Sequence, residues 1–356
     1  MSVAATVSEV VNPLASPCWQ DLTKNHRLST VFHSAQWIEA IQRTYNYEPR
    51  AILINTDRSE VPDALPYFVV NSSITGSRCV SLPFSDHCAP LVHTPEAVNS
   101  MLGPMSEVLR GSRGGYFELR PVEDCSSQLP GMNTSGSFCL HTIDLRRPLD
   151  RIFAAFHNDC IKRKLRKAQR HGLVCDEEQS ETQLQQFFGL FLQTRRRHRL
   201  APQPIEWFRN LGRFMGDAMK IRIARKDGRP IASILTLRWK KTMVYKYGCS
   251  DAAYHHFGGM QMLFWRMIQD AHASGCEEID LGRSDWDQPN LIRYKDRWGA
   301  ERSTLTYYRL WNPAIERPNG PSRARRLFNV ASRNIFPALP DYLLCKAGEA
   351  IYRHLG

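Results

Sequence analysis

The segment Met219–Gly248 reads MKIRIARKDGRPIASILTLRWKKTMVYKYG, and it decides the fold of this chain. Met219–Lys226 alternates apolar and basic residues, which predicts a half-buried strand. Asp227-Gly228 is the kind of pair that most readily takes positive φ in a two-residue hairpin. Two further runs, Pro230–Trp239 and Thr242–Gly248, are rich in strand-forming residues. The segment is therefore expected to form a meander of three antiparallel strands.

The residues after the meander predict a helix, a strand, a short helix and a last strand. Gly259–Ser274 carries apolar residues at three-to-four spacing, and Gly275 ends this helix. Glu278–Gly282 (EIDLG) is expected to be a short strand, and Arg283–Asp287 (RSDWD) is expected to be the loop after it. A final strand ends at Arg309. This order matches the core of the acyl-CoA N-acyltransferase (GNAT) fold, an α/β (α+β) fold in which two splayed central strands hold an acyl donor.

The composition is that of a globular protein with room for two domains. The chain has 356 residues, of which 42% are hydrophobic and 23% charged. No apolar run approaches the ~20 residues that span a bilayer, and the first residues lack the pattern of a signal peptide. The ten cysteines show no zinc-ligand spacing. We therefore expect reduced thiols, no metal site and a cytoplasmic location.

Positive charge is concentrated in the second part of the sequence. Residues 1–143 contain 9 Lys and Arg against 13 Asp and Glu, whereas residues 144–356 contain 38 against 22. Two runs stand out, Lys162–His171 (KRKLRKAQRH) and Arg195–Arg199 (RRRHR). Such a charge favours RNA, lipid diphosphates or an anionic membrane face as partners. A solvated helix face explains the first run equally well.

The order of predicted elements divides the chain into four parts. Residues 1–28 are expected to be an N-terminal extension, and residues 29–143 a mixed α/β domain. Residues 144–312 form a second domain with a similar element order, although no residue-level repeat is visible. The tail at 313–356 is basic and amphipathic. It is expected either to pack on the body of the protein or to lie on a membrane surface.

Five motifs stand out in the second domain: KRKLRKAQRHG (162–172), TRRRHRLAPQP (194–204), YKYGCSD (245–251), IDLGRSDWD (279–287) and RYKDRWGAE (293–301). They resemble motifs of the Fem-type (FemAB-like) peptidoglycan-bridge aminoacyltransferases and their relatives in exopolysaccharide and exosortase systems. SLPFSDHCAPL (81–91) resembles a segment of the family's first domain. The resemblance implies tandem GNAT-like domains, the first degenerate, and transfer of an acyl or aminoacyl group to an amine.

The expected catalytic residues lie near the end of the second domain. Lys295 matches the lysine that the family places near the acyl ester, where a fixed cation would stabilise developing negative charge. Arg283 and Asp285 follow a predicted strand, so they are expected to emerge at its end. Asp285 would accept the amine proton or orient Arg283. A surface lysine and a structural ion pair are the alternative interpretations.

The expected substrate-binding residues come from both domains. Tyr247 resembles the family's substrate-binding tyrosine, although its spacing alone indicates only a half-buried strand residue. The resemblance places the loop that contains Asp86 and His87 near the acceptor. Arg166 and Lys167, in the first basic run, are expected to contact an anionic substrate.

The expected donor-binding turn departs from the usual coenzyme A sequence. GNAT enzymes bind the pyrophosphate with a Q/R-x-x-G-x-G/A turn at a helix N-terminus. The matching residues here run from His255 to Met260, and we assign His256, Gly258 and Gly259 to the donor. Met260 stands where a small residue would allow close approach of a phosphate. Aminoacyl-tRNA is therefore an alternative donor to acyl-CoA, and no tightly bound cofactor is expected.

Three functions remain open from the sequence. The first is an N-acyl or aminoacyl transferase acting on an amine of an anionic glycan or lipid-linked cell-envelope precursor, with a peripheral contact at the inner membrane face. The second is a GNAT N-acetyltransferase that uses acetyl-CoA. The third is a non-catalytic protein that binds RNA or a membrane through its basic runs.

Overall fold

A computed structural model describes residues 7–56, 59–112, 114–315 and 335–356. The chain divides into two compact units, and each is described by itself. The first unit comprises residues 1–137, 305–329 and 350–356, and the second comprises residues 138–304 and 330–349. Strands β6 (Asn133–Asp144) and β12 (Glu301–Trp311) contribute residues to both. The sequence predicted a single boundary near residue 144. The observed division instead assigns the part of β12 from residue 305 onward to the first unit.

The first unit contains a mixed sheet with strand order β1-β2-β3-β4-β5-β12, in which only β4 and β5 pair in parallel. Its strands besides β12 are β1 (Val7–Val11), β2 (Glu48–Thr56), β3 (Ser59–Val70), β4 (Arg78–Val80) and β5 (Tyr116–Leu119), and its helices are α1 (Pro17–Asn25), α2 (Ala35–Tyr45) and α3 (Leu102–Gly111). The expected N-terminal extension is thus part of this unit, because β1 adds to the sheet edge beside β2. Ser34 caps α2 by accepting from the backbone N–H of Trp37, as its position in the sequence predicted.

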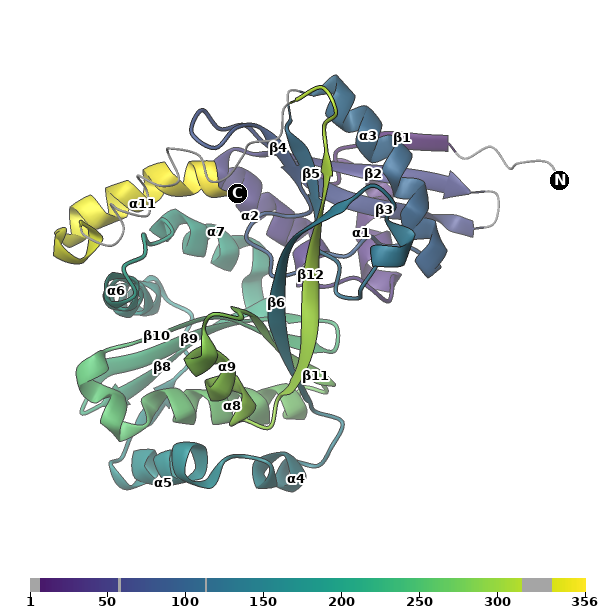
Figure 1. Cartoon of the computed structure of the whole chain (residues 1–356). Helices are drawn as coiled ribbons and strands as arrows, with labels where there is room; N and C mark the ends of the chain where they lie inside the picture. Colours follow the sequence, from purple (N-terminus) through teal and green to yellow (C-terminus); the bar gives the residue numbers. More distant parts are fainter. Residues whose placement is uncertain (1–6, 57–58, 113, 316–334) are drawn as a thin grey trace. The chain divides into compact units, whose positions relative to one another are not determined.

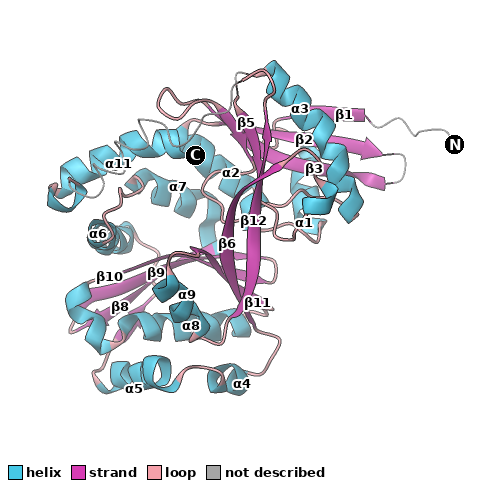
Figure 2. Cartoon of the chain, viewed as in Figure 1, coloured by secondary structure: helices cyan, strands magenta, loops and turns pink. Residues whose placement is uncertain are grey.

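The second unit contains a sheet with strand order β6-β11-β10-β9-β8-β7, in which only β10 and β11 pair in parallel (Figure 2). Its strands besides β6 are β7 (Val174–Asp176), β8 (Met219–Lys226), β9 (Arg229–Trp239), β10 (Thr242–Ser250) and β11 (Glu278–Asp285), and its helices are α4 (Leu149–Ala154), α5 (Arg163–Arg170), α6 (Glu181–Arg197), α7 (Ile205–Met215), α8 (Gly259–Ala273) and α9 (Pro289–Asp296). The meander is present, and Asp227 and Gly228 take φ values of +50° and +78° in its hairpin.

Helices α6 and α8 cover opposite faces of the second unit's sheet (Figure 1). On the α8 face, Phe264 and Met267 are buried against Ile234 and Ile279 in one continuous apolar cluster. Helix α5 packs on the outer side of α8. These contacts fix the N-terminus of α8 relative to β10, which precedes α8 in the chain, and to β11, which follows it.

Two predicted elements differ from the structure of the second unit. The expected helix from residue 149 to residue 171 is interrupted after Ala154, and a π-helical turn at Asn158–Lys162 then leads directly into α5. Strand β11 does not end at Gly282 but continues to Asp285. It continues because Arg283, Ser284 and Asp285 pair with β6, after a bulge between Asp280 and Arg283.

The described part of the tail packs on the protein. Helix α11 (Asp341–Leu355) begins beside the end of α6, where Arg196 donates to the carbonyl oxygen of Leu339 at 2.8 Å and pairs with Asp341 at 2.6 Å. Gly348 lies so close to Pro202 that an added Cβ would be 2.1 Å from the Pro202 carbonyl oxygen. Residues 316–334 of the predicted tail lie outside the described residues. None of the described helices is long and apolar enough to cross a bilayer.

Candidate active site

The parallel strands β10 and β11 separate within the second unit. They pair only over Thr242–Val244 and Glu278–Asp280, although both strands continue for several residues. Each carries an irregularity where the pairing ends: β10 has a register shift against β9 between Tyr245 and Tyr247, and β11 has the bulge that contains Gly282 at φ +69°. Bulges bend strands and re-aim side chains, so these two irregularities account for the splayed pair that the element order predicted.

A cavity of about 1110 Å³ lies in the second unit next to this opening. Residues from the end of β10, the start of α8, the start of α9 and the end of α6 line it. They are Lys164, His198, Leu200, Ile231, Ala232, Ser250, Tyr254, His255, Gly259, Met260, Gln261, Asp287, Gln288, Pro289, Asn290, Leu291 and Tyr294. A mostly apolar cavity of this size, with a few polar groups, is typical of a site for a small molecule or the end of a larger substrate.

The N-terminus of α8 begins with two glycines in close contact with neighbouring elements. Gly258 has φ +85°, and an added Cβ would be 2.6 Å from the backbone carbonyl oxygen of Lys164. A Cβ on Gly259 would be 3.2 Å from Ile231 Cδ1. The glycines therefore allow α8 to begin against α5 and the sheet, with its positive dipole end at the cavity. The side chain of Met260 lines the cavity, as its position in the turn suggested.

The two adjacent histidines of this turn have different surroundings. His255 lines the cavity, and its Nε2 lies 2.7 Å from the hydroxyl of Ser250. His256, which the sequence assigned to the donor, is exposed and has its ring against Phe257. Of the three assigned donor residues, Gly259 lines the cavity, Gly258 shapes its wall, and His256 is not among the lining residues.

Lys295 is more buried than the sequence indicated, with 4% of its surface exposed. Its Nζ donates to the carbonyl oxygen of Gly282 at 2.7 Å and lies 3.3 Å from that of Arg283. Arg283 stacks its guanidinium over the ring of Phe138, and Asp285 is exposed and accepts a hydrogen bond from Gln288. Lys295 thus meets the backbone of Arg283, but neither Lys295 nor Asp285 is among the residues that line the cavity.

The remaining predicted residues lie in several places. Tyr247 packs between α6 and α7, where its hydroxyl accepts hydrogen bonds from Gln203 at 2.7 Å and Trp207 at 2.9 Å. On α5, Arg166 is exposed and Lys167 is half-buried, and Lys164 of the same helix reaches the cavity. In the first unit, the backbone carbonyl of Asp86 accepts from Tyr307, and the buried His87 packs edge-on against Phe32.

Sequence reasoning missed several residues of the cavity. Tyr294 precedes the predicted lysine and was assigned no role; burial raises its pKa. His198 and Lys164 lie within the two basic runs but were not distinguished from their neighbours. Ser250 ends a strand and meets His255 only because a 3₁₀ turn at Ala252–Phe257 folds the chain back. Basic runs and strand ends are the signals that pointed to this region.

The corresponding opening in the first unit is closed. Beyond the parallel pairs of β4 with β5, the backbone N–H of Ser81 still donates to Glu118 O at 2.8 Å. The N–H of Arg120 donates to the Ser81 hydroxyl at 3.1 Å, and the N–H of Cys88 donates to Arg120 O at 2.7 Å. The loop after β4 therefore fills the space beside β4 and β5 that corresponds, in the second unit, to the opening between β10 and β11.

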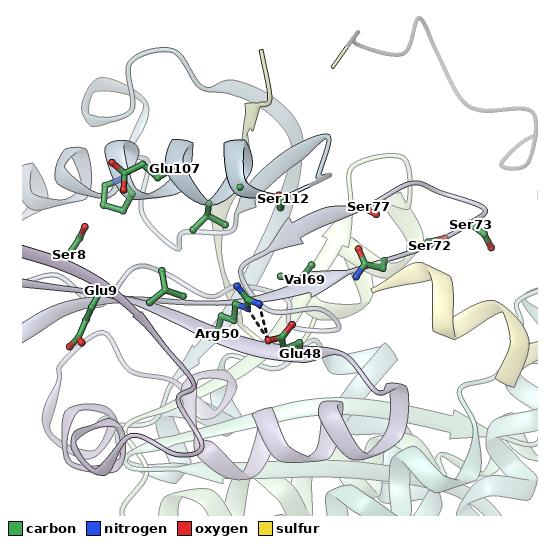
Figure 3. Close-up of a pocket in the computed structure, with 15 residues that line it drawn as sticks. Ser8, Glu9, Glu48, Arg50, Val69, Ser72, Ser73, Ser77, Glu107 and Ser112 are labelled. Carbon is green, nitrogen blue, oxygen red and sulfur yellow. Dashed lines mark hydrogen bonds and ion pairs between the residues drawn. The ribbon is translucent and has the colours of Figure 1, made fainter. Parts of the chain in front are cut away.

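The first unit instead has a polar cavity of about 960 Å³ beside α3 and the outer strands (Figure 3). Serines make up much of its lining, and its charged groups include Glu48 and Arg50, which pair at 2.9 Å. The Arg50 guanidinium therefore already has the Glu48 carboxylate as its partner within the cavity. We assign no chemistry to this cavity and place the candidate active site in the second unit.

Three histidines of the second unit give an expected pH dependence of stability. Burial, as the main cause, lowers the pKa of His141, His198 and His255. The folded protein therefore binds these protons less tightly than the unfolded chain, whose histidines titrate near 6.5. The free energy of unfolding is expected to fall as the pH drops through about 6.5. Thermal unfolding between pH 7.5 and 5.5 checks this.

The His141→Asn variant provides the control for that measurement. His141 has no exposed surface, and its Nε2 lies 3.2 Å from Asp296. The variant should show a weaker loss of melting temperature over the same pH range. A melting temperature that stays constant or rises on acidification of the wild-type protein would contradict the lowered pKa values of these imidazoles.

Comparisons with known proteins agree with this geometry. Residues 157–296 match a family model described as an acetyltransferase (GNAT) domain. The chain is 28% identical over 122 residues to a UDP-N-acetylmuramoylpentapeptide-lysine N(6)-alanyltransferase from Weissella viridescens. This match covers 34% of the chain and 36% of the relative, so it spans about a third of the relative's length.

Two solved structures share the fold over most of the chain. FemX superimposes with a TM-score of 0.69 at 14% identity, covering 92% of this chain and all of FemX. A tandem GNAT protein from the clavulanic acid biosynthesis pathway superimposes with a TM-score of 0.56 at 10% identity, covering 88% of this chain and all of that protein. The family model thus matches much of the second unit, and the chain shares its fold with FemX and the tandem GNAT protein. Part of the chain is also similar in sequence to the alanyltransferase.

Proposed function

We propose that the protein transfers an acyl or aminoacyl group to an amine of a cell-envelope or exopolysaccharide precursor. The observation that carries this proposal is the separation of β10 and β11 beyond Val244 and Asp280, beside the cavity at the start of α8. In the second unit this opening can admit the reacting end of a donor. The related alanyltransferase is named for the lysine N6 of a UDP-linked muramoyl pentapeptide, which supports an amine acceptor of this kind.

The chemistry requires an amine to attack an ester or thioester and requires the leaving group to be protonated. Tyr294 lines the cavity, and because burial raises the pKa of its phenol, the phenol is protonated at neutral pH and can donate. Lys295 is the next residue, and its ammonium holds the carbonyl oxygens of Gly282 and Arg283. We assign Lys295 to fixing the separated part of β11 and to placing positive charge near the developing oxyanion.

The donor in this proposal is aminoacyl-tRNA or acyl-CoA. The exposed Arg166 and the half-buried Lys167 lie on α5, whose Lys164 reaches the cavity, so a polyanion bound along α5 would enter there. The turn before α8 lacks the usual glycine spacing, and Met260 lies in the path of a pyrophosphate. Both features favour aminoacyl-tRNA. The charge of the same half also supports the proposed contact with an anionic inner membrane face.

Incubation with each donor tests this proposal. The protein would be given UDP-linked muramoyl pentapeptide together with either alanyl-tRNA or acetyl-CoA, and the acceptor would be analysed by mass spectrometry. We expect transfer from aminoacyl-tRNA. We also expect acetyl-CoA to bind more weakly than micromolar in isothermal titration. Transfer from neither donor to any envelope or exopolysaccharide amine would reject the proposed function.

An acetyl-CoA-dependent N-acetyltransferase is the second candidate, because the matching family model describes acetyltransferases. Tight, stoichiometric binding of acetyl-CoA would favour it over the aminoacyl-tRNA donor. A non-catalytic RNA- or membrane-binding protein is the remaining alternative, and the separation of Lys295 and Asp285 from the lining of one cavity agrees with it. Binding of tRNA without any transfer would support that alternative.

A further inference from the structure

A buried histidine and the candidate catalytic lysine lie at the bulge of β11. Strand β6 pairs with β11 on both sides of this bulge, at Asp280 and at Arg283, and His141 is the β6 residue between those two pairs. His141 has no exposed surface. The ammonium group of Lys295 donates to the carbonyl oxygen of Gly282 within the bulge at 2.7 Å. Residues from two different elements, β6 and α9, are thus brought to one short irregular segment of β11.

His141 belongs to a row of four polar side chains in the second unit. Its Nε2 lies 3.2 Å from Oδ1 of Asp296, the last residue of α9. The same carboxylate accepts a hydrogen bond at 2.6 Å from Nε of Arg302, near the start of β12. The Sγ of Cys139, two residues before His141 on β6, lies 3.7 Å from Nδ1. Both ring nitrogens of the buried imidazole therefore have partners.

The charges along this row fix the direction of its hydrogen bonds. Arg302 holds the pKa of the Asp296 carboxyl below its ordinary value, so the carboxylate is ionised near neutral pH and can only accept. The Nε2 of His141 therefore carries the proton and donates it. Burial raises the pKa of the Cys139 thiol, which stays protonated and can donate to Nδ1. The neutral imidazole thus suits both neighbours, whereas an imidazolium would direct a second N–H at a thiol.

Helix α9 depends on contacts of this kind for its position. It has eight residues, whereas a helix that is stable by itself in water needs about 12–15. Its first residues, Pro289–Leu291, are exposed, and its buried residues are Ile292 and Lys295. The contact of Asp296 with His141 ties the end of the helix to β6, one residue after Lys295. Loss of this contact should therefore let the lysine side chain move relative to the bulge.

We propose that His141 is a positioning residue for Lys295: its neutral imidazole donates to Asp296, holds the end of α9 against β6 and so keeps the ammonium group at the β11 bulge. This inference rests on the proposed function, in which that ammonium group places positive charge near the developing oxyanion. His141 is fully buried and acts through Lys295. Its loss should therefore lower the turnover number more than it changes the affinity for substrates.

Replacement of His141 by leucine removes the contact. With whichever donor supports transfer, His141→Leu should lower kcat by about 10–100-fold and leave KM within a few-fold, since a misplacement of about 1 Å costs about a hundredfold. His141→Gln should recover most of the rate, because its amide N–H can reach Asp296. A folded His141→Leu variant with a rate within a few-fold of wild type would overturn the proposal.

Ser284→Ala is the matched control for these variants. Ser284 pairs with Cys139 across the two strands and is as well buried as His141. Its hydroxyl has no hydrogen-bond partner among the residues that the structure describes. The control therefore changes a buried polar side chain next to the row without breaking a hydrogen bond, and it should keep the wild-type rate.

A pH profile separates positioning from a merely structural role. Burial is the main cause that lowers the pKa of His141, Lys295 and Arg302 lower it further, and the contact with Asp296 opposes them. Cys139 is the other titratable group beside the ring. Protonation of His141 below about pH 6.5 would place a second cation beside Lys295. The ratio of the His141→Gln rate to the wild-type rate should therefore rise as the pH falls from 7.5 to 5.5, because glutamine does not titrate. A constant ratio would overturn the proposal.

Chemical labelling of lysines tests the position of Lys295 without any turnover. The full-length protein would be treated with the N-hydroxysuccinimide ester of acetic acid. Peptide mass spectrometry would compare the acetylation of Lys295 with that of Lys241, whose side chain is 70% exposed. Lys295 should be protected in the wild-type protein and in His141→Gln, and acetylated in His141→Leu. Equal protection in the wild-type protein and in folded His141→Leu would overturn the proposal.

A second variant and the labelling keep this inference distinct from the proposed function. If His141→Leu does not fold, Asp296→Ala removes the acceptor of the same contact and should give the same loss of rate and the same acetylation of Lys295. A wild-type protein that transfers no acyl group but shows the expected labelling would reject the proposed function and support the positioning of Lys295. Transfer at the wild-type rate by folded His141→Leu would do the reverse.

Discussion

Replacement of Lys295 by methionine is expected to lower the rate of acyl transfer by at least about a hundredfold. The ammonium group is buried and donates to the carbonyl oxygen of Gly282 in the separated part of β11. Removing a positioned cation from a developing oxyanion typically costs two to three orders of magnitude, or ~2.7–4 kcal/mol. Steady-state rates with whichever of the two donors supports transfer would measure the loss.

The same substitution is also expected to destabilise the protein. Methionine leaves the Gly282 carbonyl without its donor, and a buried polar group that loses its partner costs about 1–3 kcal/mol. Lys241→Met is the control, because the Lys241 side chain is 70% exposed and pairs with Glu277 at the surface. Turnover of Lys295→Met within a few-fold of wild type would show that Lys295 only supports the fold.

Replacement of Gly258 by alanine is expected to disrupt the start of α8 and weaken donor binding. A left-handed backbone costs a residue with a Cβ about 1–2 kcal/mol, and Gly258 has φ +85°. The new Cβ would also lie 2.6 Å from the carbonyl oxygen of Lys164, so α5 or α8 must move. A displacement of about 1 Å at a reaction site costs about a hundredfold in rate. Chemical unfolding and donor titration would check both effects.

Gly275→Ala separates the two causes. Gly275 has φ +75° at the other end of the same helix, and nothing lies within 4 Å of an added Cβ. Its substitution therefore measures the backbone strain alone. The excess destabilisation of Gly258→Ala over Gly275→Ala reports the contact with α5. Equal destabilisation of the two variants, with unchanged donor binding, would refute the steric role of Gly258.

Local signals in the sequence predicted the part of the fold that surrounds the cavity. The pair Asp227-Gly228 predicted the hairpin between β8 and β9, and both residues take positive φ there. The spacing of apolar residues, together with Gly275, predicted the helix that is α8 in the structure. These signals act between residues close in the chain, where turn chemistry and helix periodicity decide the structure. The opening between β10 and β11 came from the element order, which is characteristic of the GNAT fold.

The features that sequence reasoning missed depend on contacts between distant residues. Strand β11 runs past Gly282 because Arg283 and Asp285 find partners on β6, and nothing in the RSDWD sequence indicates that pairing. The burial of Lys295 also depends on a contact between distant residues, because its Nζ donates to the carbonyl oxygen of Gly282 in the bulge of β11. The assigned catalytic and binding roles of these residues remain predictions.

The contrast between the closed strand pair of the first unit and the open pair of the second has a consequence for local stability. Around Ser81 and Arg120, backbone hydrogen bonds continue beyond the β4–β5 pairs, and each is worth about 0.5–1.5 kcal/mol. The second unit lacks β10–β11 ladder bonds beyond Val244 and Asp280. Its backbone amides there should exchange with solvent hydrogen sooner than those of the first unit. The strand separation that leaves room for a reaction site therefore also makes this region the most easily opened part of the second unit's sheet.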